Sequence, residues 1–416
     1  MGTSGGAVAR LVREEGTRVL ATLVRVTGSV DLAEDATQDA VVRALETWPV
    51  DGVPDNPRGW LLVTAKRRAI DLLRREARRA GKEAAAMDPA VPPWGDGLFD
   101  MTPEPAEVVR DDLLRLVFTC CHPALAVETQ VALALRTLGG LSTAAVARGL
   151  LVPEATMAKR LTRAKQKIAR AAIPYRVPAA EDLPARLTGV AATIYLIFNE
   201  GYAAGAGADL VRMGLTGEAI RLARLLAELM PDDATVLGLL ALLLLQDSRR
   251  DSRLDSDGRL VLLPDQDRGR WDAEAIRQGV TLVGAALRRS PDRPNQYVLQ
   301  AAIAACHALA QSYPETDWNA VISWYDVLLR VQDTSVVRLN RAAAIAERDG
   351  PSAGLALLDT IGDLDGYPWW HATRAELLRR LHRDGEAGVA YRRALELDLS
   401  EPQSAHLRAR LAELAE

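Results

Sequence analysis

Apolar residues recur at intervals of three and four positions along nearly the whole chain, which is the spacing of one face of an α-helix. Alternation of apolar and polar residues, which marks a half-buried strand, never persists. The longest apolar run, from Val236 to Leu245, is interrupted only by Gly238, and a membrane-spanning helix needs about 20 apolar residues. We therefore predict an all-α protein, with this run as a buried helix and with no membrane span.

The first predicted unit covers residues 5–79 and contains three helices. Asp31 is placed to cap the second helix, which is expected to end at Trp48. Turn-forming residues crowd positions 49–57 and predict a loop before a third helix over 58–79. The first helix carries an apolar stripe, made of Val8, Leu11, Val12, Val19, Leu23 and Val26.

Glycine and proline then interrupt the helical pattern over residues 80–106, which predicts a flexible linker. Trp94 and Phe99 within it either dock on a folded part or are incidental. A second helical unit is expected over residues 107–172. It contains helices over 108–119 and 126–138 and a tightly joined pair over 142–150 and 154–170.

The remaining chain, residues 183–416, alternates helical segments with short polar turns. Near its end, Ala387, Tyr391 and Ala394 have the spacing found in the second helix of a tetratricopeptide repeat, where small residues let helices pack closely. Weaker copies lie at 338–358 and 217–231. We predict a tetratricopeptide-like helical extension.

Two helices concentrate positive charge. In the segment 154–170 an inner stripe of Met157, Leu161, Ala164 and Ile168 opposes an outer face with Lys159, Arg160, Arg163, Lys165 and Lys167. A tight helix pair with a basic second helix favours a helix-turn-helix that enters the DNA major groove. A solvated basic helix is the alternative.

The second basic segment is the helix over 58–79. Its inner stripe is predicted from Trp60, Leu61, Val63, Ile70 and Leu73. Such a density of cations fits a track for nucleic-acid phosphates, although a solubilising amphipathic helix has the same pattern. The cations are Lys66, Arg67, Arg68, Arg74, Arg75, Arg78 and Arg79.

Composition narrows the remaining choices. The net charge of −4 means that nucleic-acid binding must come from local clusters. Three cysteines, two of them adjacent, and an N-terminus without an apolar segment favour a cytoplasmic protein. Cys120, Cys121 and His122 are consecutive and do not converge on one ion, so we expect no metal. We find no catalytic or phosphate-binding motif and expect a non-enzyme without a cofactor.

Three segments in this order resemble the two conserved domains of extracytoplasmic-function sigma factors, of the sigma-70 family, over about residues 5–172. They are 33–40, then 56–61 with 65–75, and 141–167. The resemblance implies that the first segment binds the beta-prime coiled coil of core RNA polymerase. It implies that the second melts and reads the −10 element of promoter DNA. The third is implied to read the −35 element, close to the polymerase beta flap.

The resemblance also implies roles for individual residues. The residues implied to bind polymerase are Glu34, Asp35, Gln38 and Asp39. Those implied to bind the −35 element are Thr156, Lys159, Arg160 and Arg163. Those implied to bind the −10 element are Asp55, Asn56, Arg58, Trp60, Lys66, Arg67, Arg74 and Arg75. The family often has asparagine at the position of Arg67, so the −10 sequence preference is open at that position.

Residues 118–123 and 197–202 resemble the subgroup with a tetratricopeptide-like extension, which is thought to regulate in place of an anti-sigma factor. Asn199, Glu200 and Tyr202 are expected to contact the sigma domains, polymerase or another protein partner. A helix end capped by Gly201 is the alternative. The competing function is a helical-repeat scaffold or a helix-turn-helix regulator without polymerase. The acidic helix at 34–39 argues against it, because a free-standing repressor has no use for that helix.

Overall fold

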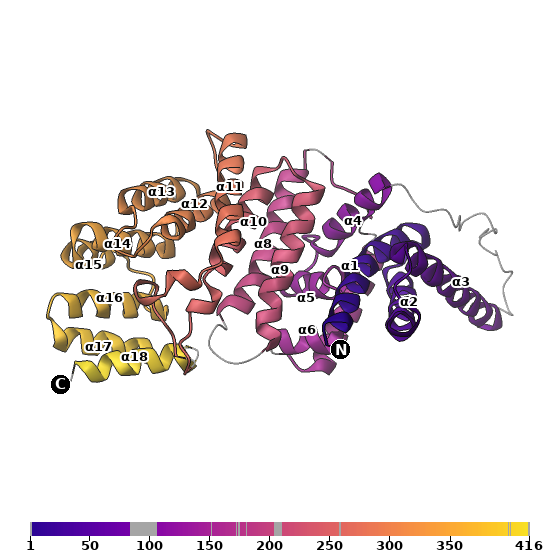
Figure 1. Ribbon diagram of the computed structural model, residues 1–416, viewed down its shortest axis with the longest axis horizontal. Coiled ribbons are helices and arrows are strands. Elements are labelled where there is room, and N and C mark those ends of the chain that lie inside the picture. Colours follow the sequence, from indigo (N-terminus) through magenta and orange to yellow (C-terminus); the bar gives the residue numbers. More distant parts are fainter. Residues whose placement is uncertain are drawn as a thin grey trace. The chain divides into compact units, whose positions relative to one another are not determined.

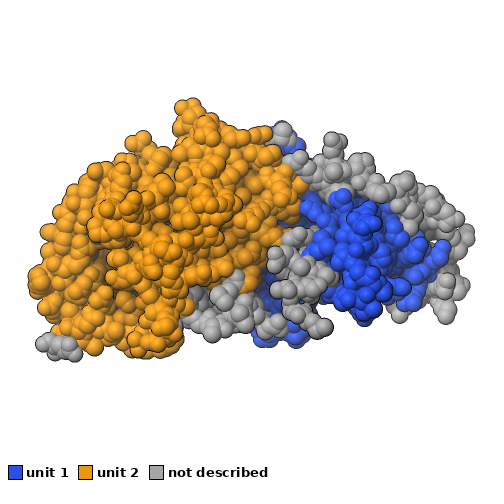
Figure 2. All heavy atoms as spheres, in the orientation of Figure 1, with its two compact units in different colours: residues 1–196 blue, residues 197–416 orange. Residues whose placement is uncertain are grey.

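The computed structural model describes residues 2–83, 106–150, 152–171, 173, 175–179, 181–203, 210–257, 259–397, 399 and 401–414. Helices dominate these residues, and an isolated antiparallel bridge joins Leu254 and Leu260. The all-α prediction is confirmed. The chain divides into two compact units, unit 1 (residues 1–196) and unit 2 (residues 197–416), coloured separately in Figure 2. No helix in the described ranges is long and apolar enough to cross a membrane.

Unit 1 begins with α1 (Gly2–Thr27), α2 (Val30–Asp51) and α3 (Pro57–Glu83), which pack on one another. Val12, Val19 and Leu23 of the predicted stripe are buried, whereas the side chain of Val8 lies outside the described residues. The prediction that Asp31 caps α2 is wrong. The N-cap is Ser29, two residues earlier, whose hydroxyl accepts a hydrogen bond from the amide of Leu32 at 3.3 Å.

The helix α2 also continues past its expected end, through Pro49 to Asp51, and stops at Gly52, whose φ is 89°. Pro49 has no backbone amide to donate, so the last turn of α2 lacks one backbone hydrogen bond, and the helix ends two residues after the proline. The α3 helix runs four residues beyond its predicted end, to Glu83. Residues 84–105, with Trp94 and Phe99, lie outside the described part of the chain.

The inner face of α3 differs from the predicted stripe. Leu61, Ala65 and Ala69, spaced four residues apart, are almost fully buried, and Leu62 is 8% exposed. Trp60, Val63, Ile70 and Leu73 are only half-buried. The two alanines let α3 approach its neighbours closely, so the smallest side chains mark the contact and the larger ones flank it.

The second half of unit 1 follows the predicted pattern within a few residues. It contains α4 (Ala106–Cys120), α5 (Val127–Thr137), α6 (Thr143–Gly149) and α7 (Glu154–Arg170). Val146 of α6 is fully buried. The inner stripe of α7 is confirmed, since Met157, Leu161, Ala164 and Ile168 are all buried.

The next helix, α8 (Leu183–Ala203), belongs to both units by sequence, because unit 1 ends at Leu196. Within unit 1, Arg186 Nη2 donates to the carbonyl of Phe118 at 2.6 Å. The Thr193 hydroxyl donates to Gln130 Oε1 at 3.2 Å. The start of the predicted extension therefore packs with the preceding domain. The helix continues through Gly201, which is buried, so the capping role considered for this glycine is wrong.

Unit 2 is a succession of helices in which neighbours along the chain pack together (Figure 1). The helices are α9 (Leu210–Leu229), α10 (Ala234–Asp247), α11 (Ala273–Arg289), α12 (Gln296–Leu309), α13 (Trp318–Val331), α14 (Ser335–Asp349), α15 (Pro351–Leu358), α16 (Pro368–Arg380), α17 (Asp384–Leu395) and α18 (Glu401–Glu413). The short 3₁₀ turns Arg250–Ser252, Leu263–Asp265 and Arg268–Arg270 connect α10 to α11.

Small residues lie at close contacts between helices of unit 2. The run from Val236 to Leu245 is buried in α10, as predicted, and a Cβ added at Gly238 would lie 2.5 Å from Val298 Cγ2 of α12. Ala387, Tyr391 and Ala394 are buried on α17, which packs on α16. The small residues allow these approaches.

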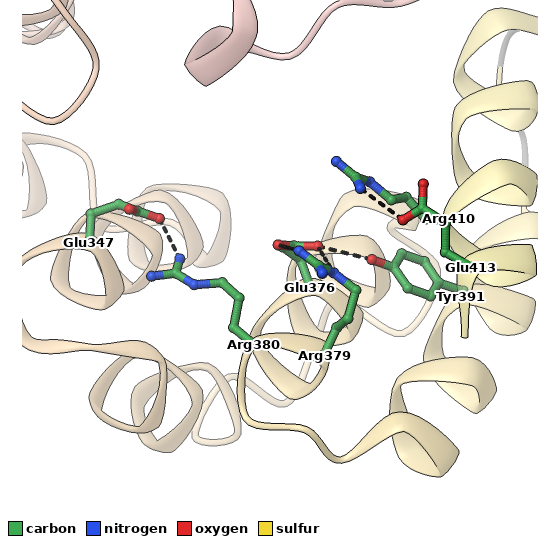
Figure 3. A network of polar contacts seen from close by, with 7 residues as sticks. All are labelled: Glu347, Glu376, Arg379, Arg380, Tyr391, Arg410 and Glu413. Carbon is green, nitrogen blue, oxygen red and sulfur yellow. Dashed lines mark hydrogen bonds and ion pairs between the residues drawn. The ribbon is translucent and has the colours of Figure 1, made fainter. Parts of the chain in front are cut away.

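A polar network spans the last helices (Figure 3). Glu376 of α16 accepts from Arg379 Nη2 at 2.7 Å and from the Tyr391 hydroxyl at 3.1 Å. Arg380 Nη1 donates to Glu347 at 2.6 Å. Burial raises the pKa of the Glu376 carboxyl, but Arg379, the Tyr391 hydroxyl and the charge of Arg410 together outweigh burial, so its pKa lies below the usual value. The carboxylate therefore stays charged inside this packing.

Candidate functional site

The outer face of α7 carries the residues predicted for the DNA duplex. Thr156, Lys159 and Arg163 are exposed, and Arg160 is half-buried. Within the described ranges, no acid forms an ion pair with Lys159, Arg160 or Arg163. Because the opposite face of the helix is held in the core, these side chains are presented together on one surface.

The residues predicted for the −10 element lie in the loop before α3 and along that helix. Arg67, Arg74 and Arg75 are exposed, as are Asp55 and Asn56. Asn56 Oδ1 accepts from the amide of Gly59 at 2.9 Å, which ties the loop to the first turn of α3. The predicted −10 residues named here therefore lie either in the loop before α3 or on α3 itself.

Three other residues of this group are less accessible. Trp60 is half-buried and meets Trp48 edge to face, with ring centroids 5.5 Å apart. Arg58 Nε lies 3.9 Å from Glu15 Oε2. Lys66 departs from the predicted outward basic face, since it is only 3% exposed. Its position one residue after Ala65 places it at the margin of the packed face.

The acidic residues of α2 do not form one open surface. Asp35 and Asp39 are exposed and Gln38 is half-buried. Asp39 forms an ion pair with Arg68 of α3. Burial raises the pKa of the Asp35 carboxyl, and the nearby charge of Lys165 opposes that rise without cancelling it.

Glu34, the fourth of these residues, is buried and forms ion pairs with two cations from the second half of unit 1. Arg136 Nη2 of α5 lies 2.5 Å from Glu34 Oε1, and Lys165 Nζ of α7 lies 2.7 Å from Oε2. Lys165 Nζ also lies 2.9 Å from Asp31 Oδ1. We call Asp31, Glu34, Arg136 and Lys165 the Glu34 ion cluster. The pattern along α7 counted Lys165 among the outer cations and gave no signal for Arg136.

A cavity of about 200 Å³ lies beside this cluster. Its wall includes Leu20 of α1, Glu34, Thr37 and Gln38 of α2, and Arg136 of α5. The packing of α5 against α1 and α2 is therefore incomplete at this place.

In unit 2, the residues predicted to make a regulatory contact differ in their surroundings. Tyr202 stacks on Phe198, with centroids 5.2 Å apart, and its hydroxyl lies 3.1 Å from Gln246 Oε1. The guanidinium of Arg253 sits 3.8 Å from the centroid of the Tyr202 ring. Asn199 is half-buried, and the side chain of Glu200 lies outside the described residues. Tyr202 is thus held by side chains of its own unit.

The adjacent cysteines are buried on the inner side of unit 1. Burial raises the pKa of Cys121 to about 12, although the Thr193 hydroxyl and the charge of Arg186 act against it. Burial also raises the pKa of Cys120. Both thiols therefore stay protonated near neutral pH, and a protonated thiol is a poor nucleophile and metal ligand. In the described part of the chain, no cluster of three or more His, Cys, Asp or Glu residues is arranged to hold a metal.

Comparison with known proteins assigns families to three segments. Residues 11–79 match Sigma-70 region 2, and residues 115–168 match Sigma-70, region 4. Residues 186–287 match a family of unknown function, DUF6596. An uncharacterized protein of Rhizobium meliloti (strain 1021) is 42% identical over 407 residues, which cover 96% of this chain and 93% of that protein. The chain therefore belongs to the sigma-70 family, as a sigma factor of the extracytoplasmic-function-like type with a C-terminal extension.

Proposed function

We propose that this sigma factor binds core RNA polymerase, directs it to promoters and catalyses nothing itself, with the extension regulating its activity. The observation that carries the proposal is the outer face of α7. Lys159, Arg160 and Arg163 on that face have no acidic partner in the described ranges, and the opposite face of the helix is held in the core of region 4. A basic helix held in this way fits the major groove of a −35 element.

The proposed contacts with DNA divide between the two regions. Thr156, Lys159, Arg160 and Arg163 of α7 would bind the −35 duplex. Asp55, Asn56, Arg58 and Trp60, at the loop before α3, would hold an unpaired base of the −10 element, as flipped bases are held in pockets. Lys66, Arg67, Arg74 and Arg75 would follow the single strand, where charge and stacking hold the backbone. The burial of Lys66 makes it the weakest member of this set.

The proposed polymerase contact uses α2. Asp35 and Asp39 are exposed and offer carboxylates to the beta-prime coiled coil, while Gln38 and Glu34 lie beside them. Region 4 would lie near the beta flap. Such a protein works in the cytoplasm, where its polymerase and DNA are found.

The regulatory role is proposed for the helical extension, whose buried small residues on α17 are compatible with tetratricopeptide-like pairs. Asn199, Glu200 and Tyr202 would form the contact with unit 1, polymerase or another protein. The packing of Tyr202 inside unit 2 favours a structural part for its ring and leaves Asn199 as the better candidate for direct contact.

The test is transcription in vitro with core polymerase and the full chain, on a library of upstream DNA fragments. We expect promoter-specific transcripts and co-elution of the chain with polymerase. Replacing Asp35 and Asp39 together with alanine should reduce both. Asp292→Ala, which removes an exposed acid of unit 2, is the control and should change neither.

Two results would decide against the proposal. A chain that binds DNA but never co-elutes with polymerase is a free helix-turn-helix regulator. A double variant that transcribes as well as the unchanged chain removes α2 from the contact. Full-length variants are preferred to a chain ending at residue 172, because that truncation removes Arg186 and Thr193, which hydrogen-bond within unit 1.

A further inference from the structure

The Glu34 ion cluster joins region 4 to the polymerase-binding helix proposed above. Glu34 keeps only 5% of its side chain exposed, and its two partners, Arg136 and Lys165, keep 15% and 16%. Ion pairs on an open surface contribute little, but these charges are mostly removed from solvent and screened less by salt. Arg136 Nη1 also donates to the carbonyl of Leu141 at 2.9 Å, which fixes its guanidinium.

A second group of contacts holds α1 to residues on either side of region 4. Arg25 Nε of α1 donates to Asp112 Oδ2 of α4 at 2.9 Å, and Asp112 is fully buried. The Tyr175 hydroxyl lies 2.7 Å from the carbonyl of Ala21 and 2.9 Å from that of Asp112. The second half of unit 1 is therefore held to region 2 at two separate places, the Glu34 ion cluster and these contacts with α1.

Lys165 is distinct from the cations proposed for DNA. At about 100° per residue, it lies at least about 120° around α7 from Lys159, Arg160 and Arg163. Burial lowers the pKa of Lys165. The charge of Glu34 and the hydrogen bonds to Glu34 and Asp31 raise it by more than burial lowers it, so the pKa lies above its ordinary value. The ammonium therefore stays charged near neutral pH and keeps its hold on α2.

We infer that region 4, through Arg136 and Lys165, covers Glu34 in the free protein, and that core polymerase must displace these cations to engage the whole acidic face of α2. The inference rests on the proposed polymerase contact. Asp35 and Asp39 remain exposed and give polymerase a first point of contact. Because of the cavity beside the cluster, the docked face is not close-packed at this place, so its separation loses fewer contacts.

The docked arrangement is tested with a carbodiimide in the full chain. The carbodiimide adds to a carboxylate and activates it, and the Lys165 amine then attacks the activated carbonyl to form an amide. The reagent leaves as a urea, which carries the oxygen and hydrogens of the water lost in the coupling. We expect a peptide that links Lys165 to Asp31 or Glu34 in the mass spectrum. Lys165→Arg is the control, because it keeps the positive charge but forms no stable amide.

Addition of saturating core polymerase should abolish this cross-link. Its absence from the free chain would overturn the docked arrangement. Its persistence in the purified complex with polymerase would overturn the covering of Glu34, because polymerase would then bind without displacing Lys165.

Affinity gives an independent measurement. Lys165→Gln weakens docking and should tighten polymerase binding by about three- to tenfold, because a larger fraction of the chain is then competent to bind. Arg170→Gln removes an exposed cation from the same helix and should leave affinity unchanged. Thermal unfolding of both variants checks that unit 1 remains folded.

The outcomes separate the inference from the proposed function. If the unchanged chain binds polymerase and Lys165→Gln binds equally or more weakly, the inference alone is overturned. If no version binds polymerase while the cross-link still forms, the proposed function fails and the inference fails with it.

Discussion

Arg160→Ala should weaken promoter binding by the polymerase complex by about 1–3 kcal/mol, which is about five- to 150-fold in Kd. The range follows from the surroundings of the residue. Arg160 is half-buried on the outer face of α7, and no described acid pairs with it, so its guanidinium is available for two parallel hydrogen bonds to a guanine. Alanine is a better helix former than arginine, so the substitution should not unfold α7.

The assay is fluorescence anisotropy of a labelled promoter titrated with the complex, repeated at several salt concentrations. Loss of a base contact should weaken binding mainly to the preferred −35 sequence. Loss of a phosphate contact should instead weaken all sequences alike and reduce the slope of log K against log salt by about 0.9. Arg160→Lys keeps the charge but not the planar fork, and is expected to recover only the phosphate component.

An Arg160→Ala protein with the same affinity and salt slope as the unchanged chain would refute a role for this guanidinium in promoter binding. A uniform loss accompanied by a lower unfolding temperature would point to damaged folding and would also contradict it, since the side chain is placed outside the core.

Three further predictions concern stability. Met157→Ala should lower the free energy of unfolding of unit 1 by about 2–5 kcal/mol, because a fully buried side chain leaves a cavity; urea denaturation measures it. Gly238→Ala should lower that of unit 2 by about 1–3 kcal/mol, because the new Cβ would lie 2.8 Å from the backbone nitrogen of Val298. The lowered native pKa of Glu376 contributes stability that is complete above its unfolded pKa, about 4.3, and is lost as pH falls through the native pKa. Glu376→Gln should remove this acid dependence, measured by denaturation at several pH values.

Each of these predictions has a matched control. Thr156→Ala alters an exposed position beside Met157, and Gly217→Ala adds a Cβ at an exposed position with no atom within 4 Å, so neither should destabilise comparably. Glu396→Gln changes an exposed acid at the end of α17, the helix that packs on α16, and should preserve the acid dependence. If a control substitution had the same effect as the substitution that it accompanies, burial or ion pairing would not be the cause of the change.

The sequence by itself determined the all-α class, the bounds of α7, its inner stripe and the burial of the run from Val236 to Leu245. These features follow from the helical period, which is a local property of the chain. The order of the motifs also predicted the family, and the comparisons confirm it. Candidate residues on the outer face of α7 were accessible to the same argument, because the opposite side of a buried stripe faces outward.

Only the tertiary structure decided which charges are covered. Lys66 and Lys165 have the same pattern of neighbours as exposed cations, yet one is buried on α3 and the other binds α2. Glu34 meets a lysine 131 positions later in the chain. Such a pair depends on how two domains pack, and no local spacing along the chain encodes it. The helical period predicts which face of a helix is buried in its own domain, but it does not predict which outward charge contacts a second domain.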